Sequence, residues 1–183
     1  RKELLDFFGA EECLYVVSPS SNEIDMSFFD EIMEMDKTGV LSENKIKFFI
    51  KDKRVEYCSE HVYFFHEFLS DDEYSYVLKE ASFVLLLYNE KTYRYRVSGV
   101  YFDAVTFQKP IIYSNNLFFE DQRRRFHDIG VLLDGSVFKC IEEIQKCNYS
   151  LYQMQMEAIR EAYSGKELLK EFKEVLRDES VIY

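Results

Sequence analysis

The sequence predicts an α/β fold, a Rossmann-like, doubly wound parallel sheet of about six strands with C-terminal helices. Strand-like and helix-like patterns alternate over roughly the first 145 residues, which is typical of parallel strands joined by crossover helices. The segment from Phe83 to Tyr113 holds one complete unit of strand, polar loop, helix and strand. With 2 prolines and 6 glycines in 183 residues, no segment has the composition of a linker. We therefore expect a single domain over residues 1–183, with 148–183 as a C-terminal helical segment.

The first three strands and the first helix are predicted from short, clearly bounded runs. Cys13 to Val17 is a β-branched and aromatic run closed by polar residues and Pro19, as at the end of a buried strand. Asp25 can cap the helix that follows, and apolar residues recur on one face of that helix until Gly39. The next two strands are expected at Ile46–Ile50 and Val62–Phe65.

A capping box predicts the next helix. Ser70 and Glu73 have the required spacing, and the apolar residues after them share one helical face. The elements expected after this helix are, in order, a strand at Phe83–Tyr88, a helix after Ser98, a strand at Pro110–Tyr113, a helix at Glu120–Asp128, a strand at Val131–Leu133, a helix through Val137–Ile144, and helical sequence from Ser150 that restarts at Ser164.

Ligands of doubly wound sheets bind outside the carboxyl ends of the strands. The loops expected to form one rim at that edge are Ser18–Glu23, Lys51–Arg54, Glu67–Ser70, Asn89–Ser98 and Ser114–Phe118.

The turn at Ser98 and Gly99 is the predicted anion site. A helix that begins here presents the free N–H groups of Ser98, Gly99 and Val100 at the positive end of its dipole, where an anion is favoured. Arg94 and Arg96 precede the turn and alternate with tyrosines, so both fall on one side of an extended segment. These five residues form the predicted diphosphate-binding site. Ion pairing of the arginines with the many acidic residues is the alternative.

Asp103 is the predicted ribose-binding residue, one to two turns into the same helix. The helix is apolar nearly all round, so a carboxylate on it requires a partner. An ionised carboxylate is an acceptor that can bond both ribose hydroxyls. Diphosphate and ribose together indicate a nucleotide. A solvated position on the helix is the alternative role for Asp103.

Composition limits the partners. With 34 acidic and 23 basic residues the net charge is −11, so the chain repels nucleic acid, and we expect no nucleic-acid partner. The longest apolar run is far below the roughly 20 residues of a membrane-spanning helix, and no signal-peptide pattern is present. We expect a soluble, cytoplasmic protein. Because the chain begins at Arg1, we expect it to be a piece of a longer polypeptide.

Other reactive side chains receive structural interpretations. The four cysteines lack Cys-x-x-Cys spacing and have apolar neighbours, which favours reduced core thiols. The three histidines lack metal-ligand spacing, so we assign them no catalysis and predict no metal site. Phe64, Phe65 and Phe68 are expected to pack in the core or at the rim. The run Arg123–Arg125 is interpreted as a solvated helix face, with contact to a lipid-linked acceptor or an anionic membrane as the alternative.

Four segments carry a resemblance to a known family: Ser70–Tyr74, Leu78–Tyr88, Ser98–Ala104 and Lys109–Ser114. In this order they resemble the C-terminal, nucleotide-sugar donor-binding domain of GT-B fold glycosyltransferases, and the turn resembles that of a bacterial surface-polysaccharide subgroup. The resemblance runs from Ile46 to Leu133. It implies that the amides of Ser98, Gly99 and Val100 meet the diphosphate, that Asp103 binds the ribose, and that the backbone of Glu67, Phe68 and Leu69 reads the base.

The chain departs from the family pattern at two places. Tyr95 stands eight residues before Asp103, where retaining members carry a glutamate that contacts the donor sugar. The loop Ser18–Asn22 lacks the usual arginine and lysine, so Arg94 and Arg96 are the expected substitutes. The catalytic residues are therefore not identified.

The resemblance implies a hexosyltransferase-like enzyme, retaining and metal-independent, that uses a nucleotide diphosphate sugar in bacterial polysaccharide biosynthesis and needs no further cofactor. A missing N-terminal domain would bind the glycan or lipid-linked acceptor, so the isolated chain should bind its donor but barely catalyse. The full-length protein would contact the inner face of the membrane peripherally. The alternatives are a degenerate glycosyltransferase fold and a non-catalytic flavodoxin-like or receiver-like signalling or interaction module. The loop Ser18–Asn22 lacks the acidic cluster of receivers, which counts against the second alternative.

Overall fold

The computed structural model describes residues 2–9, 12–20, 24–88 and 98–167. Its centre is an all-parallel sheet of six strands in the order β3-β2-β1-β4-β5-β6. This order confirms the predicted Rossmann-like, doubly wound fold class. The strands are β1 (Leu14–Ser18), β2 (Ile46–Lys51), β3 (Val62–Phe65), β4 (Phe83–Leu86), β5 (Ile111–Tyr113) and β6 (Gly130–Leu132).

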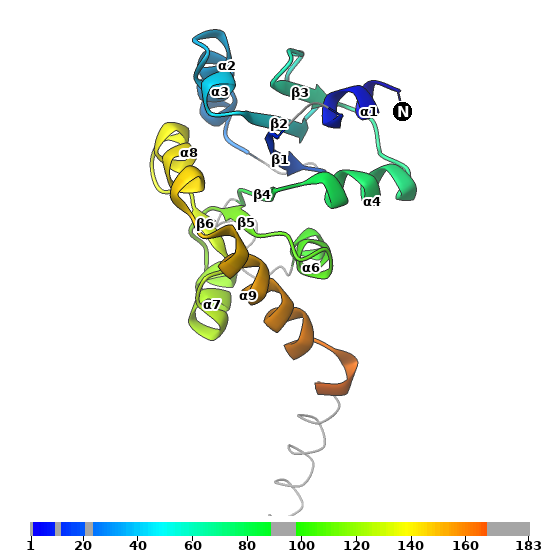
Figure 1. Cartoon of the computed structure of the whole chain (residues 1–183), viewed down its shortest axis with the longest axis vertical. Helices are drawn as coiled ribbons and strands as arrows, with labels where there is room; N and C mark the ends of the chain where they lie inside the picture. The colour runs from blue at the N-terminus through cyan, green and yellow to red at the C-terminus, as the bar shows by residue number, and fades with distance from the viewer. Residues whose placement is uncertain (1, 10–11, 21–23, 89–97, 168–183) are drawn as a thin grey trace, which may run out of the picture.

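Helices cover both faces of the sheet (Figure 1). One face is covered by α2 (Met26–Lys37), α3 (Val40–Glu43) and α8 (Val137–Lys146). The other is covered by α1 (Lys2–Phe8), α4 (Asp71–Glu80), α6 (Gly99–Thr106), α7 (Leu117–Phe126) and α9 (Tyr149–Ala162). From β1 the chain adds β2 and β3 toward one edge of the sheet, and from β4 it adds β5 and β6 toward the other edge. Because all crossovers have the same hand, the crossover helices of the two halves lie on opposite faces.

Side-chain caps set where most of the helices begin. Ser70 accepts a hydrogen bond from the Glu73 N–H, and the Glu73 side chain accepts from the Ser70 N–H, so the predicted capping box is present. Asn116 caps α7 by a single bond, in which its side-chain oxygen accepts from the Phe119 N–H (3.0 Å). The helix therefore begins three residues before the predicted Glu120. Asparagine is a preferred N-cap, and this signal was missed.

Two helices were not predicted from the sequence. In α1, Phe7 and Phe8 are buried and lie against Tyr15 and Phe49 of the sheet. The Tyr15 hydroxyl also donates a hydrogen bond to the Phe8 carbonyl (3.0 Å). This short helix is thus held by tertiary packing more than by its own sequence. The one-turn helix α3 contributes the fully buried Leu41.

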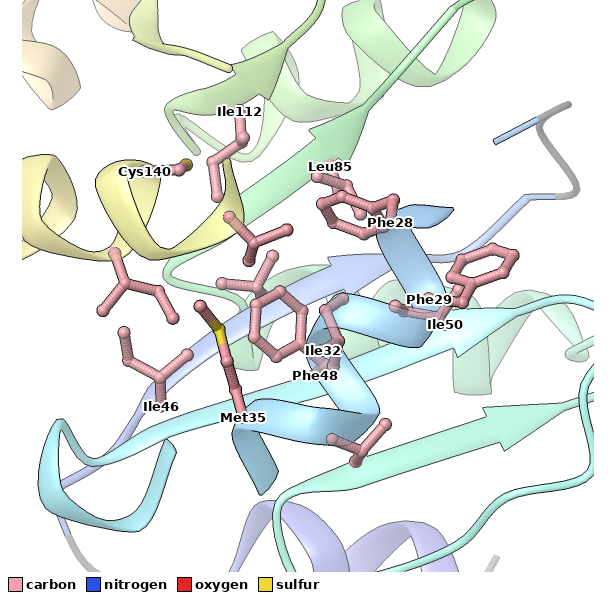
Figure 2. Packing of buried hydrophobic residues seen from close by; sticks show 14 of the residues in the cluster. Phe28, Phe29, Ile32, Met35, Ile46, Phe48, Ile50, Leu85, Ile112 and Cys140 are labelled. Atoms are coloured by element: carbon pink, nitrogen blue, oxygen red, sulfur yellow. The ribbon is translucent and has the colours of Figure 1, made fainter. Parts of the chain in front are cut away.

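The α2–α8 face shows how the core is built (Figure 2). Phe28, Phe29, Ile32 and Met35 of α2 and Cys140 of α8 point toward the sheet, where they pack on side chains of β2, β4 and β5. Strands buried on both faces form continuous apolar runs, which is why β4 shows no polar alternation.

The cysteine prediction holds for one core thiol and is wrong for another. Cys140 is buried, and burial raises the pKa of its thiol to about 12. Cys58, expected in the core, is exposed because it lies in the connection between β2 and β3 rather than in an element. Cys13 and Cys147 are partly buried, and all four are free. The later helical sequence, from Leu168 onward, lies outside the described residues.

Gly130 is a position where the backbone itself requires glycine. Its φ is +146°, and a Cβ there would lie 1.9 Å from the carbonyl oxygen of Ile111, its partner in the pairing of β5 with β6. This contact cannot relax without moving the strand backbone.

We predict that Gly130→Ala lowers the free energy of unfolding by more than about 1 kcal/mol, which corresponds to a fall in Tm of at least about 2–4 °C. Thermal denaturation followed by circular dichroism measures this. Gly99→Ala is the matched control, since a Cβ at Gly99 has no neighbour within 4 Å. Equal Tm values for the two variants would contradict the steric argument.

Candidate functional site

A cavity of about 290 Å³ opens at the carboxyl edge of the sheet, on the α2–α8 face. Its walls come from the segments after β1, β4, β5 and β6 and from the N-terminal parts of α2 and α8, through Ile24, Asp25, Ser27, Phe28, Glu31, Leu87, Tyr88, Ser114, Leu133, Gly135 and Val137. β1 and β4 are neighbours whose chains leave toward opposite faces, so this is the topological switch point of the sheet.

Two carboxylates line this cavity. Asp25 accepts the N–H and hydroxyl of Ser27 at 2.9 and 2.8 Å, and these bonds lower the pKa of the Asp25 carboxyl. Glu31 accepts the N–H groups of Val137 (2.9 Å) and Phe138 (3.4 Å). The first amides of α8 are therefore already paired with a carboxylate from α2. Among the described residues of the lining, none is basic.

Ser98, predicted to contact the diphosphate, has a structural role at the start of α6. It is 3% exposed, and its hydroxyl oxygen accepts the Tyr101 N–H (3.0 Å) and pairs with the Tyr88 hydroxyl. The Tyr88 ring stacks on Phe119, with centroids 5.6 Å apart, and the Ser114 hydroxyl bridges the backbone N–H and carbonyl of Tyr88. This network fixes the first turn of α6 relative to the end of β4.

Beyond Ser98, the first turn of α6 is open. Gly99 is exposed, and a Cβ at this position would meet no atom within 4 Å. Within the described part of the chain, the N–H groups of Gly99 and Val100 donate no hydrogen bond. As far as the described residues go, two amides and the positive end of the helix dipole are therefore not engaged by other groups, an arrangement that favours an anion. Arg94 and Arg96, the other members of the predicted diphosphate site, lie outside the described residues.

Asp103 has a partner that the sequence did not reveal. Its Oδ2 accepts a hydrogen bond from the Tyr74 hydroxyl at 2.7 Å. Tyr74 lies in α4, and burial, followed by the bond to Asp103, raises the pKa of its phenol. A carboxylate has about four acceptor positions, so this bond leaves capacity for a ligand hydroxyl. In the sequence, Tyr74 is one of the residues after the capping box that share a helical face, and that pattern gives no sign of a bond to Asp103.

The predicted base-binding segment immediately precedes α4. Glu67 and Phe68 are exposed, whereas Leu69 is partly buried and packs against the same core cluster as Tyr74. The start of α4 therefore links the two predicted sites, because the segment leads directly into the helix whose Tyr74 bonds Asp103. Phe68 is 91% exposed, so packing in the core, one of its two predicted positions, is wrong. Its ring lies in the predicted rim loop and contacts Lys51.

Two histidines and two arginines of α7 have partners among the described residues. His61 lies 3.4 Å from Asp36, and the His66 Nε2 lies 2.9 Å from the Val55 carbonyl oxygen. Arg124 and Arg125 pair with Asp121 on an exposed face of α7, consistent with a solvated helix face. In the described ranges, no group of three or more His, Cys, Asp or Glu side chains could hold a metal ion.

Comparison of the chain with protein-family models and with curated protein sequences finds no match. Of the helices that the structure describes, none has both the length and the apolarity needed to cross a membrane.

The bond between Tyr74 and Asp103 makes a testable contribution to stability. We predict that Tyr74→Phe lowers the free energy of unfolding at pH 7 by about 1 kcal/mol, below the usual value for a bond to a charged group because the pair is partly exposed. The raised pKa means that the folded protein holds the phenol proton more tightly than the unfolded chain. The contribution is therefore complete below about pH 10 and is lost as the pH rises further.

Urea denaturation at pH 7 and pH 10.5 measures both effects. Tyr76→Phe is the matched control on the same helix, because the Tyr76 hydroxyl makes no hydrogen bond to a described residue and its pKa is raised mainly by burial. Similar losses in the two variants at pH 7 would mean that the bond to Asp103 does not stabilise the fold.

Proposed function

We propose that this chain is the nucleotide-sugar donor-binding domain of a GT-B type glycosyltransferase. The enzyme would transfer a sugar from a nucleotide diphosphate sugar to a glycan or lipid-linked acceptor in polysaccharide biosynthesis. The observation that carries the proposal is the open first turn of α6, which begins at the carboxyl edge and leads within one to two turns to Asp103.

Each part of the donor has a proposed partner. The diphosphate would take the N–H groups of Gly99 and Val100, with Arg94 and Arg96 as its cations. A ribose hydroxyl would donate to Asp103, and the base would lie against the segment from Glu67 to Leu69. As the bond to the sugar breaks, negative charge grows on the diphosphate, and fixed amides at the helix terminus can stabilise that charge by several kcal/mol.

Exposed apolar side chains at the same edge support a second domain or protein there. Met26, Phe68, Leu117 and Phe138 are 38%, 91%, 47% and 48% exposed, and each lies in the first turn of a helix or just before it. Helices that follow parallel strands begin at the carboxyl edge, so the four side chains lie at the same edge as the candidate site. The proposed occupant is the acceptor-binding half of the enzyme, which would supply the catalytic groups.

One observation favours the competing proposals, a non-catalytic interaction module or a degenerate glycosyltransferase fold. Asp25 and Glu31 give the cavity an acidic lining that does not suit a diphosphate. The donor proposal therefore places the phosphates at α6, on the opposite face from α2 and α8. A ligand-binding measurement separates this proposal from the two competing ones.

The open turn predicts a specific effect of filling it. Uridine diphosphate, as one member of a nucleoside diphosphate panel, should raise the Tm, since a hundredfold excess over Kd stabilises by about 2.7 kcal/mol. Gly99→Val should abolish most of this shift without lowering the Tm of the free protein. Gly165→Val is the matched control, because Gly165 also follows a serine cap and has open space around it. No shift with any nucleotide at millimolar concentration would favour the competing proposals.

Two further substitutions separate the ribose from the diphosphate. Asp103→Asn keeps the shape of the side chain but removes its charge, so it should weaken uridine and uridine diphosphate by similar factors. Arg96→Ala should weaken only the diphosphate, by about tenfold to a hundredfold for a charge-assisted bond of about 1.5–3 kcal/mol. Calorimetric titration measures both. If neither variant changes diphosphate affinity while the protein stays folded, the site assignment is wrong.

A further inference from the structure

Strand β2 carries two buried lysines on one face. Lys47 and Lys51 are 3% and 5% exposed, and positions four apart in a strand share a face. In the described part of the chain, neither ammonium has a carboxylate within ion-pair distance. A buried charge without a partner is costly, so what covers each lysine decides its role.

The two lysines have different covers. The Lys47 Nζ lies 5.4 Å from the centroid of the Phe7 ring, and Phe7 is itself buried among other aromatic rings. The Lys51 Nζ lies 3.2 Å from the centroid of the Phe68 ring, and Phe68 is 91% exposed. The first cover is part of the core, whereas the second is a single ring in the irregular segment between β3 and α4.

Several acidic residues lie near Lys51 or Phe68 in sequence, but among the described residues none forms an ion pair with Lys51. Asp52 is held by Arg54 at 2.6 Å, and Glu73 is engaged in the capping box with Ser70. Glu67, Asp71 and Asp72 are the other acidic residues of this region. Burial lowers the pKa of the Lys51 ammonium.

We propose that Lys51 is the cation of a phosphate-binding site at the carboxyl end of β2 and that Phe68 is its gate. When the ring rotates away, a phosphoryl group takes its place against the ammonium. The movement gives up one cation–π contact and little buried area, since the ring is already almost fully exposed. A charge-assisted hydrogen bond replaces that contact. The proposal does not depend on the identity of the nucleotide ligand.

The test is calorimetric titration with inorganic phosphate and with pyrophosphate at fixed ionic strength. Phe68→Ala should bind about 2- to 30-fold more tightly than the wild type, the range expected when a cation–π competitor is removed. Lys51→Met should bind about 10- to 100-fold more weakly, and Lys51→Arg should retain binding. The matched controls are Lys53→Met, an exposed lysine two residues from Lys51, and Phe138→Ala, an exposed phenylalanine at the start of α8 on the other face of the sheet, and both should leave affinity within about twofold.

Wild-type affinity in Lys51→Met, with the melting temperature retained, would overturn the proposal, as would weaker binding by Phe68→Ala. Titration with uridine diphosphate identifies the source of the phosphoryl group. Loss of its binding in Lys51→Met means that the lysine holds the nucleotide, whereas retention means that the site takes free phosphate. If pyrophosphate binding depends on Lys51 but no nucleoside diphosphate binds, the donor-domain proposal fails and the Lys51 site stands.

Discussion

The pairing of β1 with β4 is the constraint on which the rest of the structure depends. Only Val16 and Val17 of β1 pair with β4, through Phe83 and Val84, yet this short contact joins the two halves of the sheet. From it, the chain winds outward in both directions, so the crossover helix α2 of one half and the crossover helices α6 and α7 of the other lie on opposite faces. The cavity and the start of α6 both follow from that divergence, because it leaves room beyond the ends of β1 and β4.

The sequence predicted the fold well because the decisive signals are local. The limits of β3 were predicted correctly, and the capping box at Ser70 specified the start of α4 within four residues of sequence. The failures involve partners far apart in the chain. Glu31 contacts an amide 106 residues away, and Tyr74 contacts Asp103 across 29 residues. Periodicity and caps describe one element at a time and contain no information on such pairs.

The candidate site was predictable only as a position in the topology. A helix after the fourth strand with a serine cap and a glycine was read from the sequence, and the structure places it at the carboxyl edge. The sequence could not indicate that Ser98 is buried against Tyr88, or that Phe68 stands exposed over Lys51. Both depend on which side chains three-dimensional packing brings together. In an acidic chain of net charge −11, a few uncompensated cations and amides determine where an anion can bind.

The glycine at position 130 also gives a way to read sequence variation. Its neighbour is the backbone of Ile111, which every chain with this pairing of β5 and β6 possesses whatever its side chains. Across a set of related sequences, glycine at 130 would thus mark inheritance of the fold alone. Gly99 has no such neighbour, so the fold would allow a side chain to arise there freely. Relatives with glycine at 130 and another residue at 99 would be those that keep only the architecture. Relatives with glycine at both positions would be those that also keep a ligand at α6.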